Sequence, residues 1–175
     1  SSAGVACWDH EVNIKILLGA VVEAGDLTLK QRNDLLATMT DEVARLVLQD
    51  NYYQTLALDI ACHRPAYVLD GQQRLMQWLE GSKRLNRAIE YLPTYPEIAQ
   101  RRARKTGLTA PENAVLLAYA KMAVFDELIA SNLPDDPFYS HALKAYCPQA
   151  LRERFAQAMH AHPLKREIIA TAVTN

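Results

Sequence analysis

The sequence predicts an all-α fold, an irregular bundle of about nine helices with no significant sheet. Glycine is scarce, with 6 residues in 175, whereas the good helix formers alanine and leucine number 26 and 23. No segment of useful length alternates apolar and polar residues between turn signals, as a half-buried strand would. Half of the residues are hydrophobic, which excludes a disordered chain and provides for a packed core. The length predicts about one domain.

The first two helices are predicted from their capping residues. Asp9 is placed to cap a first helix, and Gly25 suits the left-handed residue at its end. Residues 1–8 show no helical period and are expected to precede this helix. The Thr-Leu-Lys-Gln sequence at residues 28–31 has the spacing of a capping box, which predicts a second helix that runs to about Met39.

Two further helices follow on either side of a proline. The Thr-Asp-Glu sequence at residues 40–42 caps a third, long helix and puts acidic side chains at its positive end. Pro65 closes this helix and opens the fourth, because proline fits the first turn, where no N–H is needed. The fourth helix runs to about Glu80, and Gly81 stops it.

The middle of the chain predicts three more helices. A short fifth helix spans Lys83 to Tyr91 and ends before Pro93. Pro96 starts a sixth, which ends at Gly107. Residues 109–112, Thr-Ala-Pro-Glu, form a capping box with proline inside the first turn, and they open a helix that runs to about Ser131.

This last helix is predicted to lie at the centre of the bundle. Residues 114–125 are apolar on nearly every face, with only Lys121 interrupting, and such a helix is usually buried all round. Prolines then divide the tail into three short helices: Pro134, Pro137, Pro148 and Pro163.

Charge, cysteine content and the length of the apolar stretches argue against a nucleic-acid-binding, membrane-spanning or disulfide-rich secreted protein. The net charge of −1 gives no global attraction to nucleic acid or to an anionic membrane. The three cysteines are an odd and widely spaced set, which indicates a reducing cytoplasm rather than a disulfide framework. The longest apolar stretches, 16–22 and 114–120, fall short of the roughly 20 residues that cross a bilayer. The first residues do not resemble a signal peptide.

The patterns of catalytic and metal sites are missing from the sequence. No histidine or cysteine has the spacing of a C-x2-C or H-E-x-x-H site, and no local signature pairs a cysteine with a histidine for nucleophilic catalysis. No G-x-G-x-x-G or G-x-x-x-x-G-K-[ST] loop is present for a phosphate. The residues considered are His10, His63, His141, His160 and His162, with Cys7, Cys62 and Cys147. We therefore predict no catalytic, cofactor-binding or metal-binding residue.

Two charged clusters leave an alternative open. In the Asp-His-Glu sequence at residues 9–11, a helix cap and a first-turn acid explain both acids, but His10 is left over, and a catalytic role is its alternative. Residues 101–105 carry four positive charges. They suit the negative end of a helix, and the alternative is a patch for phosphate or nucleic acid.

Two further groups are interpreted as structural. Asp135 and Asp136 are interpreted as a turn and a helix cap ahead of Phe138 rather than a metal-binding pair. The aromatic residues Tyr52, Tyr53 and Trp78 are interpreted as core residues rather than as a stacking surface.

A series of strings along the chain resembles the large, multidomain bacterial NAD-specific glutamate dehydrogenases. The strings occur in order and span nearly the whole chain, and only residues 61–103 match loosely. They are residues 2–5, 9–18, 27–28, 39–44, 50–52, 54–55, 107–112, 114–119, 126–128, 133–137, 151–155 and 162–171.

The resemblance implies that residues 1–8 are the tail end of the catalytic core segment and that residues 9–175 are a C-terminal helical domain. The parent enzyme converts L-glutamate, NAD and water to 2-oxoglutarate, ammonia and NADH. Its catalytic and NAD-binding residues are expected before Ser1, and the family continues beyond Asn175. The resemblance therefore implies an internal fragment that binds no cofactor and is inactive by itself, with NAD acting in the parent.

One residue is carried over from the family to an active site. Residues 1–8 resemble the Asn-Ala-Gly-Gly-Val-x-x-Ser segment that closes the active site of ordinary glutamate dehydrogenases. On this match Val5 lies at the edge of the glutamate pocket in the intact enzyme. Ala6 and Trp8 depart from the family pattern, and an indole cannot replace the compact hydroxyl expected at Trp8.

The resemblance gives a structural or regulatory helical domain as the leading hypothesis. Its expected partners are the catalytic core of the same chain and further copies in a homo-oligomeric parent, with no nucleic acid and no membrane. A helical protein-interaction module without an enzymatic role is the alternative, and a nucleic-acid binder that uses Arg101 to Lys105 is a weaker one.

Overall fold

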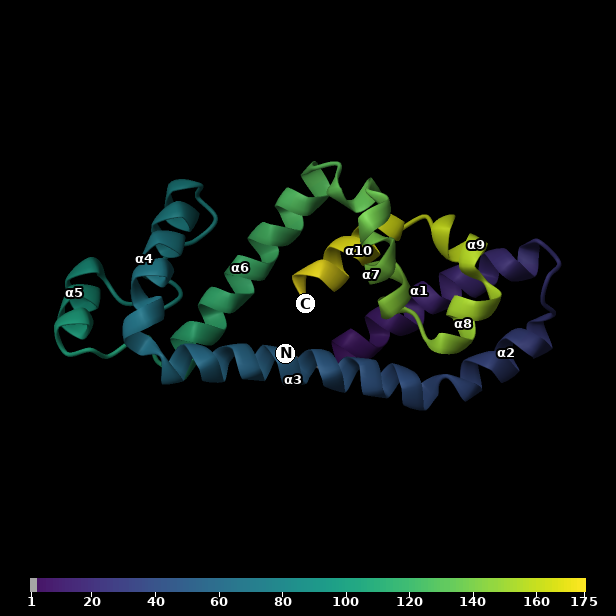
Figure 1. Cartoon of the computed structure of the whole chain (residues 1–175), viewed down its shortest axis with the longest axis horizontal. Coiled ribbons are helices and arrows are strands. Elements are labelled where there is room, and N and C mark those ends of the chain that lie inside the picture. The colour runs from purple at the N-terminus through teal and green to yellow at the C-terminus, as the bar shows by residue number, and fades with distance from the viewer. Residues whose placement is uncertain (1–2) are drawn as a thin grey trace. The chain divides into compact units, whose positions relative to one another are not determined.

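Figure 1 shows the computed structural model, which describes residues 3–175 and the side-chain surroundings of all of these except residues 3–5 and 66. The described residues form ten α-helices and two short 3₁₀ helices, without a strand, so the predicted all-α class is confirmed. The elements are α1 (Ala3–Glu23), α2 (Leu29–Thr38), α3 (Thr40–His63), α4 (Pro65–Gly81), α5 (Tyr95–Ala103), α6 (Ala110–Ala130), η1 (Leu133–Asp135), η2 (Pro137–Tyr139), α7 (Ser140–Tyr146), α8 (Gln149–Arg154), α9 (Ala156–His160) and α10 (Lys165–Thr174).

The predicted capping signals define several helix ends. At α2, Thr28 Oγ1 accepts from the Gln31 amide at 3.2 Å, and Gln31 Oε1 accepts from the Thr28 amide at 2.9 Å. Thr109 and Glu112 exchange the same pair of bonds before α6, at 3.4 and 2.7 Å. Gly25 has a φ of 82°, as predicted for the left-handed residue after α1. Capping hydrogen bonds and a left-handed glycine, all within one turn of the helix concerned, thus set these helix ends.

The predicted start of the first helix is wrong. α1 begins at Ala3 and runs without a break through the predicted junction after residue 8. Asp9 is not a cap, because its carboxylate accepts hydrogen bonds from Asn13 Nδ2 and from the Tyr146 hydroxyl. A tertiary contact therefore uses the side chain that we predicted as the cap at the start of this helix.

The predicted helix over Lys83–Tyr91 is also wrong, because this segment is a series of turns. Lys83 and Tyr91 have φ values of 58° and 54°, outside the helical region. Asn86 Oδ1 accepts from two backbone amides that follow it. Arg87 is buried and pairs with Glu80 at 2.6 Å, so a buried charge holds the turns in place.

Three smaller differences concern the second half of the chain. α5 ends at Ala103 instead of Gly107, and Lys105 has a φ of 55°. α6 is not buried on every face, since Met122 and Val124 are about half exposed. The tail holds four α-helices and two 3₁₀ helices where three helices are predicted.

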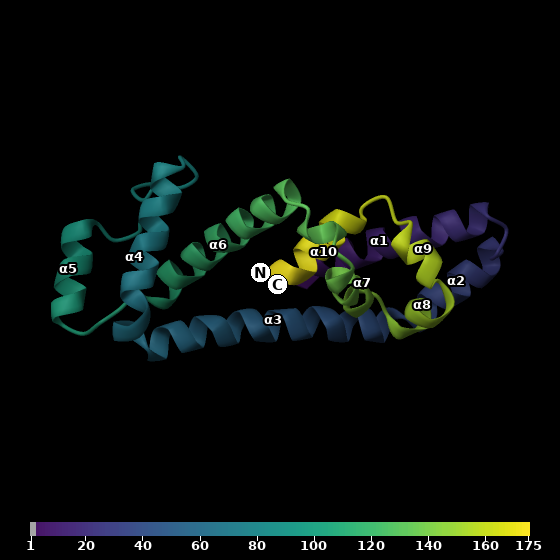
Figure 2. The same cartoon turned by 45° about the horizontal axis from the view of Figure 1, so that its top comes forward.

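The chain divides into two compact units, each with its own core. Residues up to 52 and from 125 onward form the first unit, in which α10 lies against α7 (Figures 1 and 2). Its most buried apolar side chains include Leu18, Leu143, Leu151, Met159 and Ile169. Residues 53–124 form the second unit, in which α4 lies against α5. Its core includes Leu69, Met76, Leu79, Ile98 and Leu116.

A close backbone approach in the second unit gives a prediction. A Cβ at Gly107 would lie 2.6 Å from the Cβ and 3.0 Å from the Cα of Pro65, whereas a Cβ at Gly19 in α1 would meet nothing within 4 Å. Gly107→Ala is expected to destabilise the chain by about 1–3 kcal/mol, because two backbone segments must separate. Gly19→Ala is expected to stabilise it by about 0.5–1 kcal/mol, as alanine does inside a helix. Urea unfolding of both variants checks the opposite signs, and equal effects would contradict the crowding at Gly107.

Candidate functional site

A polar network joins α1 to α7 inside the first unit. The Tyr146 hydroxyl donates to Asp9 Oδ2 at 2.8 Å and accepts from Asn13 Nδ2 at 2.9 Å. Asn13 Nδ2 also donates to Asp9 Oδ1 at 3.2 Å. Tyr146 is 7% exposed, and burial raises the pKa of its hydroxyl far above the usual value, so the hydroxyl stays protonated as the donor. Three side chains thereby hold one another in fixed orientations.

His10 is buried against this network. It is 4% exposed, and its ring stacks on the ring of Tyr146 with centroids 4.1 Å apart and planes 18° from parallel. Its Nδ1 has no hydrogen-bond partner among the described residues. Burial lowers the pKa of His10 below its usual value of 6.5, and the carboxylates of Asp9 and Asp50 and the Tyr146 backbone oppose this only in part. His10 is therefore neutral near pH 7.

His162 ties the segment between α9 and α10 to α1. Its Nδ1 accepts from the Leu164 amide at 3.0 Å, which leaves the proton on Nε2, and Nε2 donates to the Asn13 carbonyl at 3.1 Å. His162 is 6% exposed, and both of its ring nitrogens are used. Of the two buried histidines in this region, only His10 retains an unpartnered ring nitrogen within the described part of the chain.

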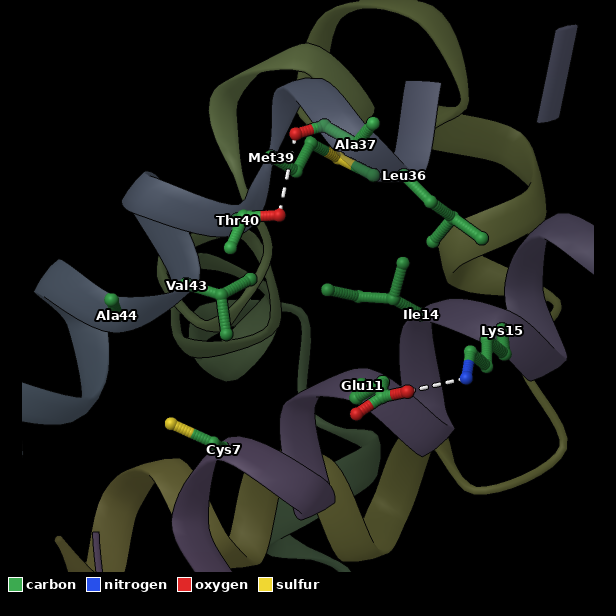
Figure 3. Close-up of a pocket in the computed structure, with 10 residues that line it drawn as sticks. All are labelled: Cys7, Glu11, Ile14, Lys15, Leu36, Ala37, Met39, Thr40, Val43 and Ala44. Atoms are coloured by element: carbon green, nitrogen blue, oxygen red, sulfur yellow. Dashed lines mark hydrogen bonds and ion pairs between the residues drawn. The ribbon is translucent and has the colours of Figure 1, made fainter. Parts of the chain in front are cut away.

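A hollow of about 470 Å³ opens between α1, α2 and α3 (Figure 3). Its walls are mainly apolar, and Figure 3 shows Ile14 reaching from α1 toward Val43 of α3. Lys15 pairs with Glu11 at the rim, so these two charges are already satisfied. The lining residues are Cys7, Glu11, Ile14, Lys15, Leu36, Ala37, Met39, Thr40, Val43 and Ala44.

A second hollow, of about 480 Å³, lies between α1 and α10. Trp8 stands at its rim with 67% of its surface exposed. Asp9 and Glu167 give it two carboxylates. Unlike the first hollow, it has no lysine or arginine in its lining. The lining residues are Trp8, Asp9, Val12, Asn13, Leu164, Glu167, Ile168 and Thr171.

The basic run at residues 101–105 is partly used inside the second unit. Arg101 donates to both oxygens of Glu112, at 2.5 and 2.8 Å. Burial alone would raise the pKa of Glu112, but the bonds from Arg101 and Thr109 outweigh it and lower that pKa. Arg102 pairs with Asp70 at 2.6 Å. Two of the four cations therefore join α5 to α6 and to α4.

The two acidic residues at 135–136 act as interpreted, but the aromatic residues do not. Asp136 Oδ1 accepts from the Phe138 amide at 2.8 Å and caps η2, and Asp135 pairs with Arg166. Tyr52, Tyr53 and Trp78 are 63%, 50% and 47% exposed, so their interpretation as core residues is wrong.

The remaining candidate histidines and cysteines form no metal-binding group among the described residues. Cys147 is buried, and burial raises the pKa of its thiol to about 11, which makes it a poor nucleophile. Across the described residues no three histidine, cysteine or acidic side chains gather as a metal would require. None of the described helices is long and apolar enough to span a membrane. Val5 lies in α1, but its side chain falls outside the described surroundings, so its place at a pocket edge stays a prediction.

The sequence patterns did not reveal Tyr146 and Asn13 as partners of Asp9. The one available signal was His10, which no capping rule explained. A buried histidine beside an acid indicates a polar partner elsewhere in the chain, but not which one.

The hydroxyl at the centre of the network gives a prediction. Tyr146→Phe is expected to destabilise the chain by about 1–3 kcal/mol, because Asp9 and Asn13 each lose a buried hydrogen-bond partner. Tyr67→Phe removes a hydroxyl from a side chain that is 84% exposed and serves as the matched control, with a change of less than about 0.5 kcal/mol. Equal losses in urea unfolding would show that the network contributes no stability.

The buried imidazole gives a second prediction. Because folding lowers the pKa of His10, the unfolded chain takes up a proton there first, and stability falls as pH drops below about 6.5. His10→Phe keeps a ring against Tyr146 and removes the titration, so its midpoint of thermal unfolding should fall less between pH 7.5 and 5.5. His160→Phe, at an exposed histidine, controls for the loss of one titratable group. A pH dependence like that of the unsubstituted chain in His10→Phe would rule out the linkage.

Comparisons with known proteins identify two regions of the chain. The family described as "Bacterial NAD-glutamate dehydrogenase, catalytic domain" matches residues 1–61, and the one described as "Glutamate dehydrogenase, C-terminal" matches residues 105–175. The first match runs past residue 8, across α1 and α2 and most of α3.

Curated relatives match the whole chain. The NAD-specific glutamate dehydrogenases of Halomonas elongata, Pseudomonas aeruginosa and Mycobacterium tuberculosis are 47%, 46% and 42% identical to it over 175 residues. Those residues are all of this chain but 11% of each relative. The chain therefore belongs, as a segment, to the family of NAD-specific glutamate dehydrogenases.

Proposed function

We propose that the chain is a structural or regulatory helical segment of an NAD-dependent glutamate dehydrogenase and that it neither binds NAD nor catalyses by itself. The parent reaction is the conversion of L-glutamate, NAD and water to 2-oxoglutarate, ammonia and NADH. The observation that carries the proposal is the 47% identity over every residue of this chain to only 11% of a relative named as this enzyme. The sequence also holds no glycine-rich loop for a dinucleotide phosphate.

Within the parent, we propose that residues 1–8 end the catalytic core segment and that residues 9–175 form the C-terminal helical domain. Val5 then lies at the edge of the glutamate pocket. Because α1 is continuous from Ala3 to Glu23, this junction divides two roles within one helix. A rigid helix would hold the end of the catalytic segment at a fixed position on the helical domain.

The partner that we propose is the catalytic core of the same chain, in a homo-oligomeric parent in the cytoplasm. Large apolar side chains at the surface support a docking role. They include Trp8, Leu48, Tyr67, Ile89, Tyr91 and Phe138, each at least 65% exposed. The pairing of Arg101 and Arg102 with acids leaves less of the basic run for nucleic acid. The same apolar side chains also suit the alternative, a helical interaction module without an enzymatic role.

The test is an assay of the separate 175-residue segment beside the full-length dehydrogenase, with circular dichroism to establish that the segment is helical. With glutamate and NAD, we expect turnover from the full-length enzyme only. NAD titrated into the folded segment should give no micromolar binding. Turnover or micromolar binding by the segment would overturn the proposal.

A sedimentation experiment separates the proposal from its alternative. The folded segment is run alone and mixed with the separately produced catalytic core. Co-sedimentation with the core supports a domain of the dehydrogenase. A segment that sediments alone in the presence of the core contradicts the docking role and favours the interaction module.

A further inference from the structure

We propose that the hollow between α1 and α10 receives a basic side chain, an arginine or a lysine, from the catalytic part of the parent enzyme. This inference rests on the proposed function, because it names the chemistry of the partner surface that the segment would dock against. The hollow was defined above by its eight lining residues. Four of its properties carry the inference: its shape, its charge, the indole at its rim and its position in the chain.

The shape comes from one face of each helix. Trp8 and Val12 are four residues apart on α1. Leu164 directly precedes α10, and Ile168 and Thr171 follow it at helical spacing within that helix. Ile168 is 4% exposed and forms part of the floor, whereas Val12 and Leu164 are 39% exposed at the sides. The space of about 480 Å³ is large enough for a long side chain with an apolar stem.

The charge of the hollow is negative and uncompensated. Asp9 and Glu167 line it, and neither has a lysine, arginine or histidine within ion-pair distance among the residues that the structure describes. The Asp9 carboxylate is held in place by Tyr146 and Asn13, through one bond to each of its oxygens. Both of these bonds come from neutral donors, so neither brings a compensating positive charge to the Asp9 carboxylate.

The nearby cation on α10 does not neutralise the hollow. Arg166 precedes Glu167, but it pairs with Asp135 and donates to the carbonyls of Ile129 and Ser131 at 3.0 and 2.9 Å. Its guanidinium is therefore bound to η1 and to the end of α6. In contrast, the first hollow contains its own Glu11–Lys15 pair, so its rim gives no preference for a charged occupant.

The exposed indole of Trp8 completes the recognition. A cation over an indole face is attracted by the ring, most strongly when water is excluded. Two carboxylates beside that ring add charge-assisted hydrogen bonds to the same cation. An acidic or neutral polar occupant would gain neither interaction, and a purely apolar one would leave both carboxylates desolvated without a partner.

The position of the hollow identifies where the cation comes from. Trp8 lies one helical turn after Val5, the residue proposed to border the glutamate pocket. A surface that meets the end of the catalytic segment at Val5 is therefore within reach of the hollow. The occupant is a basic side chain on that surface rather than on an unrelated protein.

The experiment is chemical footprinting of the full-length dehydrogenase that contains this segment. Carbodiimide and glycine ethyl ester label exposed carboxylates, hydroxyl radicals oxidise exposed indoles, and mass spectrometry reads the rate at each residue. Each rate is divided by that of the urea-unfolded enzyme. We expect Glu167 and Trp8 to react at least about fivefold more slowly in the native enzyme, because an interface core excludes water. In 1 M NaCl, where the screening length is about 3 Å, Trp8 should regain much of its reactivity.

Variants of the full-length enzyme test the sign of the charge. Glu167→Lys should raise the oxidation of Trp8 toward the unfolded rate, because a cation on the rim repels the occupant. Glu167→Gln keeps the shape and should have a smaller effect. Glu23→Lys, an exposed substitution at the other end of α1, should leave Trp8 protected. Unchanged labelling of other peptides shows that the variants remain folded.

Two results would overturn the inference, and they bear differently on the proposed function. If Trp8 reacts at the unfolded rate while other exposed apolar residues such as Tyr67 are protected, the segment docks but not through this hollow. If Trp8 is protected and neither salt nor Glu167→Lys changes that, the occupant is not basic. If every exposed residue of the segment reacts freely, the docking role itself fails together with this inference.

Discussion

The packing of the first unit depends on how α1 is held by a residue more than 130 positions further along the chain. The hydroxyl of Tyr146 bonds to Asp9 and Asn13 on successive turns of α1, and His10 stacks on the same ring. Because Asp9 and Asn13 face the network, Leu17 and Leu18, further along α1, are turned into the core beside Leu143 and Leu151. His162 adds a second tie through the Asn13 carbonyl. A buried network of this kind fixes one rotation of the helix, whereas apolar packing alone tolerates several.

In the second unit, buried and half-buried ion pairs hold neighbouring segments in fixed orientations. Arg87 is 7% exposed and pairs with Glu80, and Arg101 forms a bidentate ion pair with Glu112. Removing one partner of a buried pair leaves a charge without compensation, which costs more than an exposed pair would. These pairs join the turns after α4 to α4 itself and join α5 to α6. The basic run at residues 101–105, for which a nucleic-acid patch is the alternative interpretation, thus contributes in part to the packing of the second unit.

The parts of the fold that sequence predicts are those set by neighbours along the chain. Thr28 and Gln31 cap α2, Thr109 and Glu112 cap α6, and Pro65 separates α3 from α4, because each acts within one turn of a helix. The predictions of helix boundaries are wrong where a residue distant in the sequence forms the contact instead of a near neighbour. Asp9 looks like a cap but bonds to Tyr146, and residues 83–91 look helical but follow the buried Arg87. The sequence does not predict the network around His10 for the same reason, since no spacing rule connects residue 10 with residue 146.

The large apolar side chains at the surface are those expected of a segment that packs against a partner. Tyr52 and Trp78 have helical spacing typical of core residues, yet they are about half exposed or more. Such residues are buried in a complete protein only if another surface covers them. Trp8, at the rim of the acidic hollow, would likewise be buried only if another surface covers it. The proposed function joins these observations, because it describes a segment that supplies packing surfaces, and no catalytic group, to a glutamate dehydrogenase.

Turnover of the full-length dehydrogenase with His10→Phe tests this account most directly, because His10 is a buried titratable group with one unpartnered ring nitrogen among the residues described, and is therefore the best candidate for proton transfer. The account predicts a kcat within about twofold of the unsubstituted enzyme and an unchanged pH profile, since the loss of a general acid or base costs about 10²–10⁴-fold. A loss of that size in a protein that remains folded would contradict it and assign chemistry to this segment.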